Sequence, residues 1–233
     1  MSGPLDMKGW TDKDSKDPAY RELYERMDFV GAYARHTDMR AERGGVRGAI
    51  GRADEWESHG LEQLAFLKER GMAPGSVLLD IGCGPGRLAR RAVPFLDPAH
   101  YFGMDIAPGI LESARSLGVA EGWASRSPTF ILGDGTLGPV RALGLEPDLV
   151  WAHSVVTHLP PELVHGLLTE LAQMQFGEFL FTYKAAAKPQ RSGLKQFQYP
   201  AEWFVDAARG LGLQAEKLPK VWPAHQLTMR VWR

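Results

Sequence analysis

The stretch SVLLDIGCGPGRLA, residues 76–89, constrains the fold of this chain more than any other segment. It has the pattern of a short buried strand that ends in an acid, Asp80, and is followed by glycines at alternate positions and a helix. Gly82, Gly84 and Gly86 allow tight turns and let a ligand approach the backbone where a Cβ atom would collide. Because open α/β sheets bind ligands at the carboxyl ends of their strands, this pattern predicts a nucleotide-type loop in a parallel sheet.

The loop differs from two well-known nucleotide loops. A dinucleotide fingerprint would need a sixth-position glycine where Arg87 stands. A phosphate-binding P-loop would need Lys followed by Ser or Thr after the last glycine, and neither is present. The ligand is therefore expected to be something other than a dinucleotide or a nucleoside triphosphate.

Apolar runs alternate with helix-like segments from Val77 onward, which is typical of a parallel sheet covered on both faces. The predicted strands are 77–81, 100–105, 129–132, 149–152 and 178–183, and the predicted helices between them are 87–95, 108–117 and 161–175. A helix over 201–209 and two alternating runs, 213–218 and 226–233, suit an antiparallel pair at a sheet edge. We therefore expect a Rossmann-like, doubly wound α/β fold whose seven-stranded sheet is mostly parallel and ends in an antiparallel hairpin.

Residues 1–60 precede the first core strand and are interpreted as an N-terminal helical cap, with 61–233 as the main domain. The glycine- and arginine-rich segment RGGVRGAIGR, residues 43–52, predicts an ordered or gated loop because it holds too many glycines for a stable helix. Residues 61–70 predict an amphipathic helix that leads into the sheet. The basic run from Lys184 to Lys195 is interpreted as a solvated loop, with the steering of an anionic substrate as the alternative.

Charge and cysteine content exclude several classes. A formal net charge of -1 gives no global attraction to nucleic acid or to an acidic membrane. Cys83 is the single cysteine, so an internal disulfide is impossible, and no Cys/His cluster has the spacing of a metal site. The polar amino terminus and the absence of a long apolar segment predict a cytoplasmic protein without a membrane anchor.

Further carboxylates follow the next two predicted strands. Asp105 can accept hydrogen bonds from both hydroxyls of a ribose, and Asp134 can accept one from an adenine amino group beside the backbone of Gly135. Together with Asp80, these acids suit a cationic ligand better than a pyrophosphate. S-adenosylmethionine carries both a sulfonium and an ammonium.

These motifs resemble those of the class I S-adenosylmethionine-dependent methyltransferases over residues 61–233. LLDIGCGPG resembles the glycine-rich first motif, FGMDIAPGIL the ribose-binding acid, GDG the adenine-side motif, and DLVWAHSVVTHLP the fourth strand beside the methyl group. The resemblance implies S-adenosylmethionine as cofactor and S-adenosylhomocysteine as product. The residues implied to bind the cofactor are Asp80, Gly82, Cys83, Gly84, Asp105, Ile106, Asp134, Gly135 and Ser154.

Two histidines after the fourth predicted strand, His153 and His158, are candidate general bases. A histidine of ordinary pKa, about 6.5, is mostly neutral at pH 7 and can accept a proton. His158 and Glu162 also resemble the His-x-x-x-Glu pattern of plant phenolic O-methyltransferases, although the surrounding residues differ. A structural, hydrogen-bonded role is the alternative for each histidine. Other candidates are interpreted as packing or surface residues: Tyr33, His36 and Arg40 could reach the site if the cap folds over it, and Trp222 and His225 could border it from the other side.

The sequence predicts a methyltransferase that acts on a hydroxyl or amine of a small molecule of secondary metabolism. A methyltransferase that acts on RNA or protein through the arginine-rich segment is one alternative, and a non-catalytic S-adenosylmethionine-binding protein is another. No aromatic-lined basic groove is evident, so a nucleic-acid partner is not expected. The sequence leaves the oligomeric state open.

Overall fold

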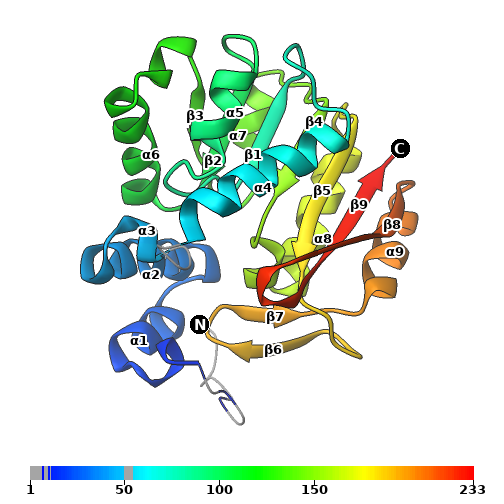
Figure 1. Ribbon diagram of the computed structural model, residues 1–233. Coiled ribbons are helices and arrows are strands. Elements are labelled where there is room, and N and C mark those ends of the chain that lie inside the picture. The colour runs from blue at the N-terminus through cyan, green and yellow to red at the C-terminus, as the bar shows by residue number, and fades with distance from the viewer. Residues whose placement is uncertain (1–6, 8–9, 11, 50–54) are drawn as a thin grey trace.

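The structure is a computed structural model, and it describes residues 7, 10, 12–49 and 55–233. Within these residues, seven strands form one sheet in the order β3-β2-β1-β4-β5-β9-β8 (Figure 1). The first five strands are parallel, and β9 runs antiparallel to both β5 and β8. The strands are β1 (Leu78–Ile81), β2 (Tyr101–Asp105), β3 (Thr129–Leu132), β4 (Leu149–Ala152), β5 (Glu178–Tyr183), β8 (Gln214–Trp222) and β9 (Gln226–Trp232). The expected Rossmann-like α/β fold is confirmed.

Alternating side chains of the central strands build a core on each face of the sheet. In β4, Val150 and Ala152 pack on one face, while Leu149 and Trp151 pack on the other. The helices α4 (Trp56–Glu69) and α5 (Ala89–Phe95) supply the core beside Trp151, and α6 (Pro108–Ala120) packs next to α5. On the opposite face lie α7 (Gly138–Ala142), α8 (Pro161–Ala172) and α9 (Ala201–Gly210). Burial on both faces explains why most side chains of the central strands are apolar.

The edge strand β8 is longer than the predicted run 213–218 because it continues past Pro219 to Trp222. Its pairing with β9 shifts register between Leu218 and Val221, around that proline. Proline is tolerated there because an edge strand has one side on which no backbone donor is needed.

The N-terminal segment forms helices, as expected: η1 (Asp14–Lys16), α1 (Pro18–Arg26), α2 (Phe29–Gly44) and α3 (Val46–Ala49). The loop prediction for residues 43–52 is wrong for its first part, because α2 extends to Gly44 and α3 begins at Val46. Gly45, with φ +79°, separates the two helices, so one left-handed residue is enough to end α2 and begin a new helical turn. Residues 50–52 of that segment lie outside the described residues.

The prediction of a solvated loop for the basic run between β5 and α9 is also wrong. In place of a solvated loop it contains a β-hairpin, β6 (Gln190–Gly193) and β7 (Gln196–Gln198), which lies next to α1 and α2 (Figure 1). Leu194, at its turn, is buried with Tyr20 and Tyr24 of α1. The two ends of the hairpin segment meet, because the Tyr199 amide donates to the Lys184 carbonyl at 2.9 Å. The hairpin and the N-terminal helices therefore share one small core.

The cap is attached to the main domain through α6. The Asp38 carboxylate of α2 accepts hydrogen bonds from the backbone amides of Ile110 and Gly109 in the first turn of α6, at 3.2 and 3.4 Å. An acid at this position pairs with otherwise unbonded amides of a helix start. The division of the chain at residue 60 stays a prediction, and α4 runs across that residue. No helix within the described ranges has the length and apolar character needed to cross a membrane.

Candidate active site

A cavity of about 580 Å³ lies at the carboxyl ends of β1, β2 and β4. Its volume falls within the range of roughly 300–1,000 Å³ that is common for ligand pockets. Residues of α2 and of the β6–β7 hairpin line it from the cap side. The cavity gathers ten of the predicted site residues: Asp80, Gly82, Cys83, Gly84, Asp105, Ile106, Gly135, His153, Ser154 and His158. Asp134 is exposed and does not line the cavity; its carboxylate accepts hydrogen bonds from the amide and hydroxyl of Thr136.

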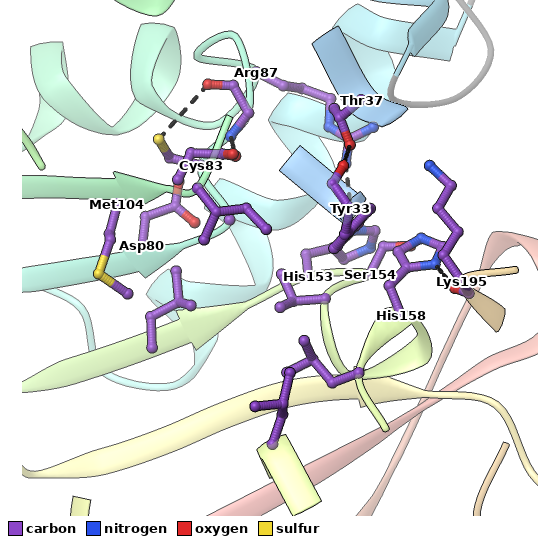
Figure 2. Close-up of a pocket in the computed structure, with 18 of the residues that line it drawn as sticks. Tyr33, Thr37, Asp80, Cys83, Arg87, Met104, His153, Ser154, His158 and Lys195 are labelled. Atoms are coloured by element: carbon purple, nitrogen blue, oxygen red, sulfur yellow. Dashed lines mark hydrogen bonds between the residues drawn. The ribbon is translucent and has the colours of Figure 1, made fainter. Parts of the chain in front are cut away.

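Two ends of this cavity differ in composition. The glycine-loop half contains Asp80, Gly82, Gly84, Asp105 and Ile106, and the His158 half contains Tyr33, His158, Lys184 and Lys195. Figure 2 shows Asp80 and Cys83 on one side of the view, and His158 and Lys195 on the other.

Glycine is required at the start of the loop for two reasons. Gly82 has φ +69°, and a Cβ atom there would lie 2.3 Å from Cγ2 of Val155. Gly84 and Gly86 also have positive φ. The Cys83 thiol is buried, and burial raises its pKa well above the ordinary value, so it is an inert packing group. The shape of the loop thus depends on backbone conformations that favour glycine, and the Cys83 thiol takes no part in its chemistry.

Asp105 ties the loop to the end of β2. Its carboxylate accepts one hydrogen bond from the Gly84 amide and another from the Ala107 amide, each at 3.0 Å. Burial raises its pKa above the usual range, and these two amides oppose that shift. Each carboxylate oxygen keeps a further lone pair for a ligand.

Ser154 follows β4 and has a strained backbone, with φ +62°. Its amide donates to the Thr182 hydroxyl at 2.7 Å, and its own hydroxyl accepts from the Gln226 side-chain amide at 3.0 Å. Gln226 in turn accepts from Thr182 at 2.6 Å. A closed network from three strands therefore holds the turn that carries both histidines.

The two histidines differ in which ring nitrogen is available. His158 Nδ1 donates to the backbone carbonyl of Lys195 at 2.6 Å, which leaves the lone pair on Nε2. His153 Nδ1 instead accepts from the Arg87 guanidinium at 3.3 Å, so its acceptor nitrogen is already used. The ring of His153 also packs edge-on against Trp222, with centroids 4.9 Å apart. Only His158 of this pair therefore keeps an imidazole acceptor that is not used by another described residue.

Both histidines depart from the ordinary pKa assumed from the sequence. The pKa of His158 is lowered to about 3. Burial is the largest cause of this shift, and the nearby charge of Lys195 is the second. Burial, followed by the charge of Arg87, also holds the pKa of His153 well below its usual value. Both imidazoles are consequently neutral throughout the ordinary pH range.

The cap contributes Tyr33 and Val30 to the cavity. The Tyr33 ring lies 5.5 Å from the ring of His158, and the Lys195 ammonium lies 5.0 Å from the centre of the Tyr33 ring. One turn before Tyr33, at the start of α2, Val30 lies over Gly135, where a Cβ atom would be 2.7 Å from Cγ2 of Val30. The helix α2 therefore covers both halves of the cavity.

This geometry agrees with a comparison to known families. Residues 78–175, from β1 to just beyond α8, match the family model described as "Methyltransferase domain". Residues 78–175 therefore form a methyltransferase domain. The glycine loop and the acid that ends β2 lie within the matched residues, whereas β8 and β9 lie beyond them.

Two curated proteins are similar to parts of the methyltransferase domain. Trans-aconitate 2-methyltransferase of Methylobacterium radiotolerans is 36% identical over 85 residues, which are 35% of this chain and 28% of that protein. Malonyl-[acyl-carrier protein] O-methyltransferase of Legionella pneumophila is 30% identical over 125 residues, 54% of this chain and 38% of that protein. The matched stretch therefore spans about a third of the length of these relatives.

Solved structures are similar over most of the chain. Magnesium protoporphyrin IX methyltransferase of Synechocystis PCC 6803, with bound S-adenosylmethionine, has a TM-score of 0.59 at 16% identity and covers 96% of this chain and 98% of that one. The mitomycin 7-O-methyltransferase MmcR has a TM-score of 0.63 at 16% identity and covers 95% and 70%. At such identities the likeness shows the fold of the methyltransferase domain.

Several buried groups of the methyltransferase domain fit S-adenosylmethionine. Asp80 is 3% exposed, and the Tyr101 hydroxyl donates to it at 2.7 Å. Burial raises the pKa of Asp80 to about 7, so a cationic ligand group beside it would stabilise its charged form. Gln63 accepts from Trp151 at 3.0 Å, but its buried amide nitrogen has no partner among the described residues. That donor and the Arg87 guanidinium line the cavity near Asp80 and suit a ligand carboxylate.

The sequence analysis gave no site role to two of these cavity residues, Gln63 and Arg87, and named Lys184 and Lys195 only as the ends of a basic run that could steer an anionic substrate. Arg87 was visible only as a departure from a glycine motif. Gln63 lies within a predicted helix that carries no motif. The burial of Lys195 depends on the hairpin, so no local pattern could have revealed it.

Proposed function

We propose that this protein transfers the methyl group of S-adenosylmethionine to a hydroxyl or amine of a small molecule and releases S-adenosylhomocysteine. The observation that carries the proposal is the neutral imidazole of His158, whose Nδ1 proton is fixed by the Lys195 carbonyl and whose Nε2 atom is available in the cavity that holds the glycine loop.

The cofactor residues are assigned by position. When bound, S-adenosylmethionine supplies a methyl group that its positive sulfur makes electrophilic. We assign the ribose hydroxyls to Asp105, the adenine face to Ile106, and the cofactor ammonium to Asp80. The backbone of Gly82, Cys83 and Gly84 would lie beside the cofactor. Asp134 and Gly135 are assigned to the adenine side, and Ser154 to the methionine side.

His158 is assigned as the general base. A neutral imidazole with a fixed tautomer can accept the proton of an acceptor hydroxyl through Nε2. Because the pKa of His158 is about 3, it is a weak base in the resting site, so proton removal is expected to accompany methyl transfer rather than precede it. His153 is the less suited alternative, since Arg87 already donates to its Nδ1 atom. Alignment of the two reactants supplies a further part of the rate, up to about 7–11 kcal/mol in well-oriented systems.

A small acceptor is favoured over RNA or protein. The helix α2 and the β6–β7 hairpin cover the His158 half, which leaves a cavity rather than an open groove. Two arginines of the arginine-rich segment already have partners in the chain: Arg43 pairs with Asp17 at 2.6 Å, and Arg47 lies over the Trp56 ring. Secondary metabolism stays a prediction; the mitomycin and glycopeptide N-methyltransferases among the similar structures show the fold alone.

The test combines binding with turnover. Calorimetry should show binding of S-adenosylhomocysteine and no binding of NAD. A panel of alcohols, phenols and amines, incubated with methyl-labelled S-adenosylmethionine, should yield at least one labelled product by mass spectrometry. Cofactor binding without turnover of any acceptor would support the non-catalytic alternative, and failure to bind S-adenosylhomocysteine would overturn the methyltransferase proposal itself.

A further inference from the structure

The ammonium of Lys195 is a buried charge that the reaction above does not use. Lys195 lies in the turn between β6 and β7 and is only 7% exposed. It lines the cavity, and within the described part of the chain no carboxylate forms an ion pair with it. The acid that also lines this part of the cavity, Asp14, is already bonded to His36 at 3.0 Å and to Arg40 at 3.1 Å.

Other residues keep Lys195 in this position. The Arg191 guanidinium donates to the backbone carbonyls of Gly193 and Leu194, which immediately precede Lys195. The same guanidinium lies over the rings of Trp10 and Phe197, at 5.0 and 5.4 Å from their centres. The backbone of the turn that carries Lys195 is therefore anchored.

Burying an ammonium without a counterion is costly. Burial lowers the pKa of Lys195 to about 8, and the charge of Arg40 contributes in the same direction. Lys184 lines the same half of the cavity and adds positive charge, whereas Asp80 and Asp105 lie in the glycine-loop half. One end of the cavity therefore holds two acids, Asp80 and Asp105, beside Arg87, and the other holds three cations, Lys184, Lys195 and Arg40, beside Asp14, so the second end favours an anion.

We propose that the methyl acceptor is a small organic acid whose carboxylate pairs with the ammonium of Lys195. This inference rests on the proposed methyltransferase function and narrows its substrate class. The carboxylate would supply the missing counterion in the buried site, where charge-assisted hydrogen bonds are strong. The reacting hydroxyl or amine of the same molecule would then lie toward His158, whose ring is bonded to the backbone of Lys195.

The pairing also acts on the base. The positive charge of Lys195 is the second cause, after burial, of the low pKa of His158. A carboxylate bound to that ammonium offsets its charge, so the pKa of His158 rises when the acid binds. Lys195 is thus a positioning residue that both anchors the acceptor and makes His158 a stronger base once the acceptor is present.

The test compares acids with their neutral amides. 4-Hydroxybenzoate and 3-hydroxybutyrate are titrated by calorimetry into protein saturated with S-adenosylhomocysteine, and 4-hydroxybenzamide and 3-hydroxybutyramide serve as matched neutral probes. The variants are Lys195→Met, which keeps the chain length without the charge, and Lys195→Arg, which keeps the charge. Lys188→Met is the control, because Lys188 is exposed in the same basic run and does not line the cavity.

We expect wild-type protein to bind each acid more tightly than its amide. Lys195→Met should weaken acid binding by about 10- to 100-fold and leave amide binding unchanged, since one charge-assisted interaction is lost. Lys195→Arg should retain part of the preference, and Lys188→Met all of it. The NMR titration of His158 should show a higher pKa with acid bound, and Lys195→Met should raise that pKa without any acid.

The same preference should fade at alkaline pH. Lys195 is charged below its pKa of about 8, so acid binding is expected to weaken as pH rises through that value. The charged and titratable groups that face it are Arg40 and His36 on α2, Asp14 on η1, Asp12 and the neutral Tyr33 and His158. The hydrogen bond from His36 lowers the pKa of Asp14 to about 2, so Asp14 keeps its charge in this range, and the alkaline fall belongs to Lys195.

In protein that binds S-adenosylhomocysteine, two results would overturn the inference and leave the methyltransferase function intact. One is equal binding of acids and amides. The other is acid binding that Lys195→Met does not weaken. Labelled product from neutral alcohols or amines at a higher rate than from any acid would also overturn it. Failure to bind S-adenosylhomocysteine, with Lys195-dependent acid binding retained, would instead overturn the methyltransferase proposal and keep an anion site.

Discussion

The two halves of the cavity are built in different ways. In the glycine-loop half, consecutive residues at the ends of adjacent strands bring their backbone to the site, and Asp105 bonds directly to the loop amide of Gly84. In the His158 half, Tyr33, His158 and Lys195 come from three elements that are far apart in sequence. The first half is therefore fixed by the sheet, whereas the second depends on the docking of the cap and the hairpin.

This difference indicates that the residues that bind the cofactor and the residues that bind the acceptor are under separate structural constraints. A loop made of backbone can serve one cofactor in many proteins, because its geometry follows from strand ends and glycines. The His158 half is formed by side chains of the cap and the hairpin, so substitutions there can change which acceptor binds without disturbing the sheet. Mutations should accordingly have separable effects on cofactor binding and on acceptor chemistry.

The largest expected effect is on turnover, and it tests whether the two halves of the cavity act separately. His158→Ala should lower turnover of a hydroxyl acceptor by about two to four orders of magnitude and leave affinity for S-adenosylhomocysteine unchanged, since only proton acceptance is removed. His165→Ala, on the exposed side of α8, is the matched control. Steady-state kinetics and calorimetry measure the two quantities. A parallel loss of cofactor affinity would show that the halves are not separable.

The pH profile of the wild type gives the same assignment a second check. Because the pKa of His158 lies at about 3, the imidazole stays neutral above that value, and turnover should show no acidic limb near pH 6.5 from this residue. A limb at the ordinary histidine pKa that disappears in His158→Ala would mean that the residue is solvated in the working enzyme.

The next effect concerns the backbone of the glycine-loop half. Gly82→Ala adds a left-handed alanine, costing about 1–2 kcal/mol, and overpacks Val155, costing about 1–3 kcal/mol more. Gly144→Ala meets the same backbone penalty at φ +62° but has open space around the new methyl group. Urea unfolding should therefore show the larger loss for Gly82→Ala. Equal losses would mean that Val155 moves aside freely.

A smaller effect separates two acids that the sequence treats alike. Asp105→Asn should weaken S-adenosylhomocysteine binding by about 10- to 150-fold, since a charged acceptor is lost. Asp134→Asn should change it by less than about tenfold, because that carboxylate is exposed and already bonded to Thr136. Calorimetry decides between them, and a loss at Asp134 as large as that at Asp105 would place its carboxylate against the cofactor.

The smallest effect tests whether the cap is the weaker region in acid. His36 is fully buried, bonded to Asp14 and Tyr24, and burial lowers its pKa below 6.5. The unfolded state therefore binds the proton first, and the stability of the cap should be lost as pH falls below about 6.5. Hydrogen exchange at about pH 7 and pH 5 should show earlier loosening of α1 and α2 than of the sheet. The same acid loosening in His36→Gln would contradict this cause.

The sequence predicted the sheet well because its signals are local. The bounds of β3, β4 and β5 agree with the predicted runs, since each strand is a short, mainly apolar segment between turns or helices. The glycine loop and Asp105 could also be recognised in the sequence, because each lies at the end of a strand. The clustering of ten predicted residues around one cavity agrees with those motifs, while their individual roles remain to be measured.

The other half could not be predicted because its properties arise from tertiary packing. Lys195 stands in a basic, polar run, and only the contact of Leu194 with Tyr20 and Tyr24 explains why the following lysine is buried. The low pKa of His158 has the same origin, since burial causes it and no neighbour in the sequence signals it. Similarly, the choice between His153 and His158 depends on Arg87, which is 66 residues away from the first of them.

The meeting of the two ends of the hairpin segment has a practical consequence for protein engineering. Because the Tyr199 amide bonds to the Lys184 carbonyl, and the Ala186 amide bonds to the Tyr199 carbonyl at 3.1 Å, the residues between them leave the sheet and return to it at one point. Such a segment is a natural place to graft turns of other lengths and charges. Libraries that vary it, with β5 and α9 kept intact, would explore new acceptors on an unchanged cofactor scaffold.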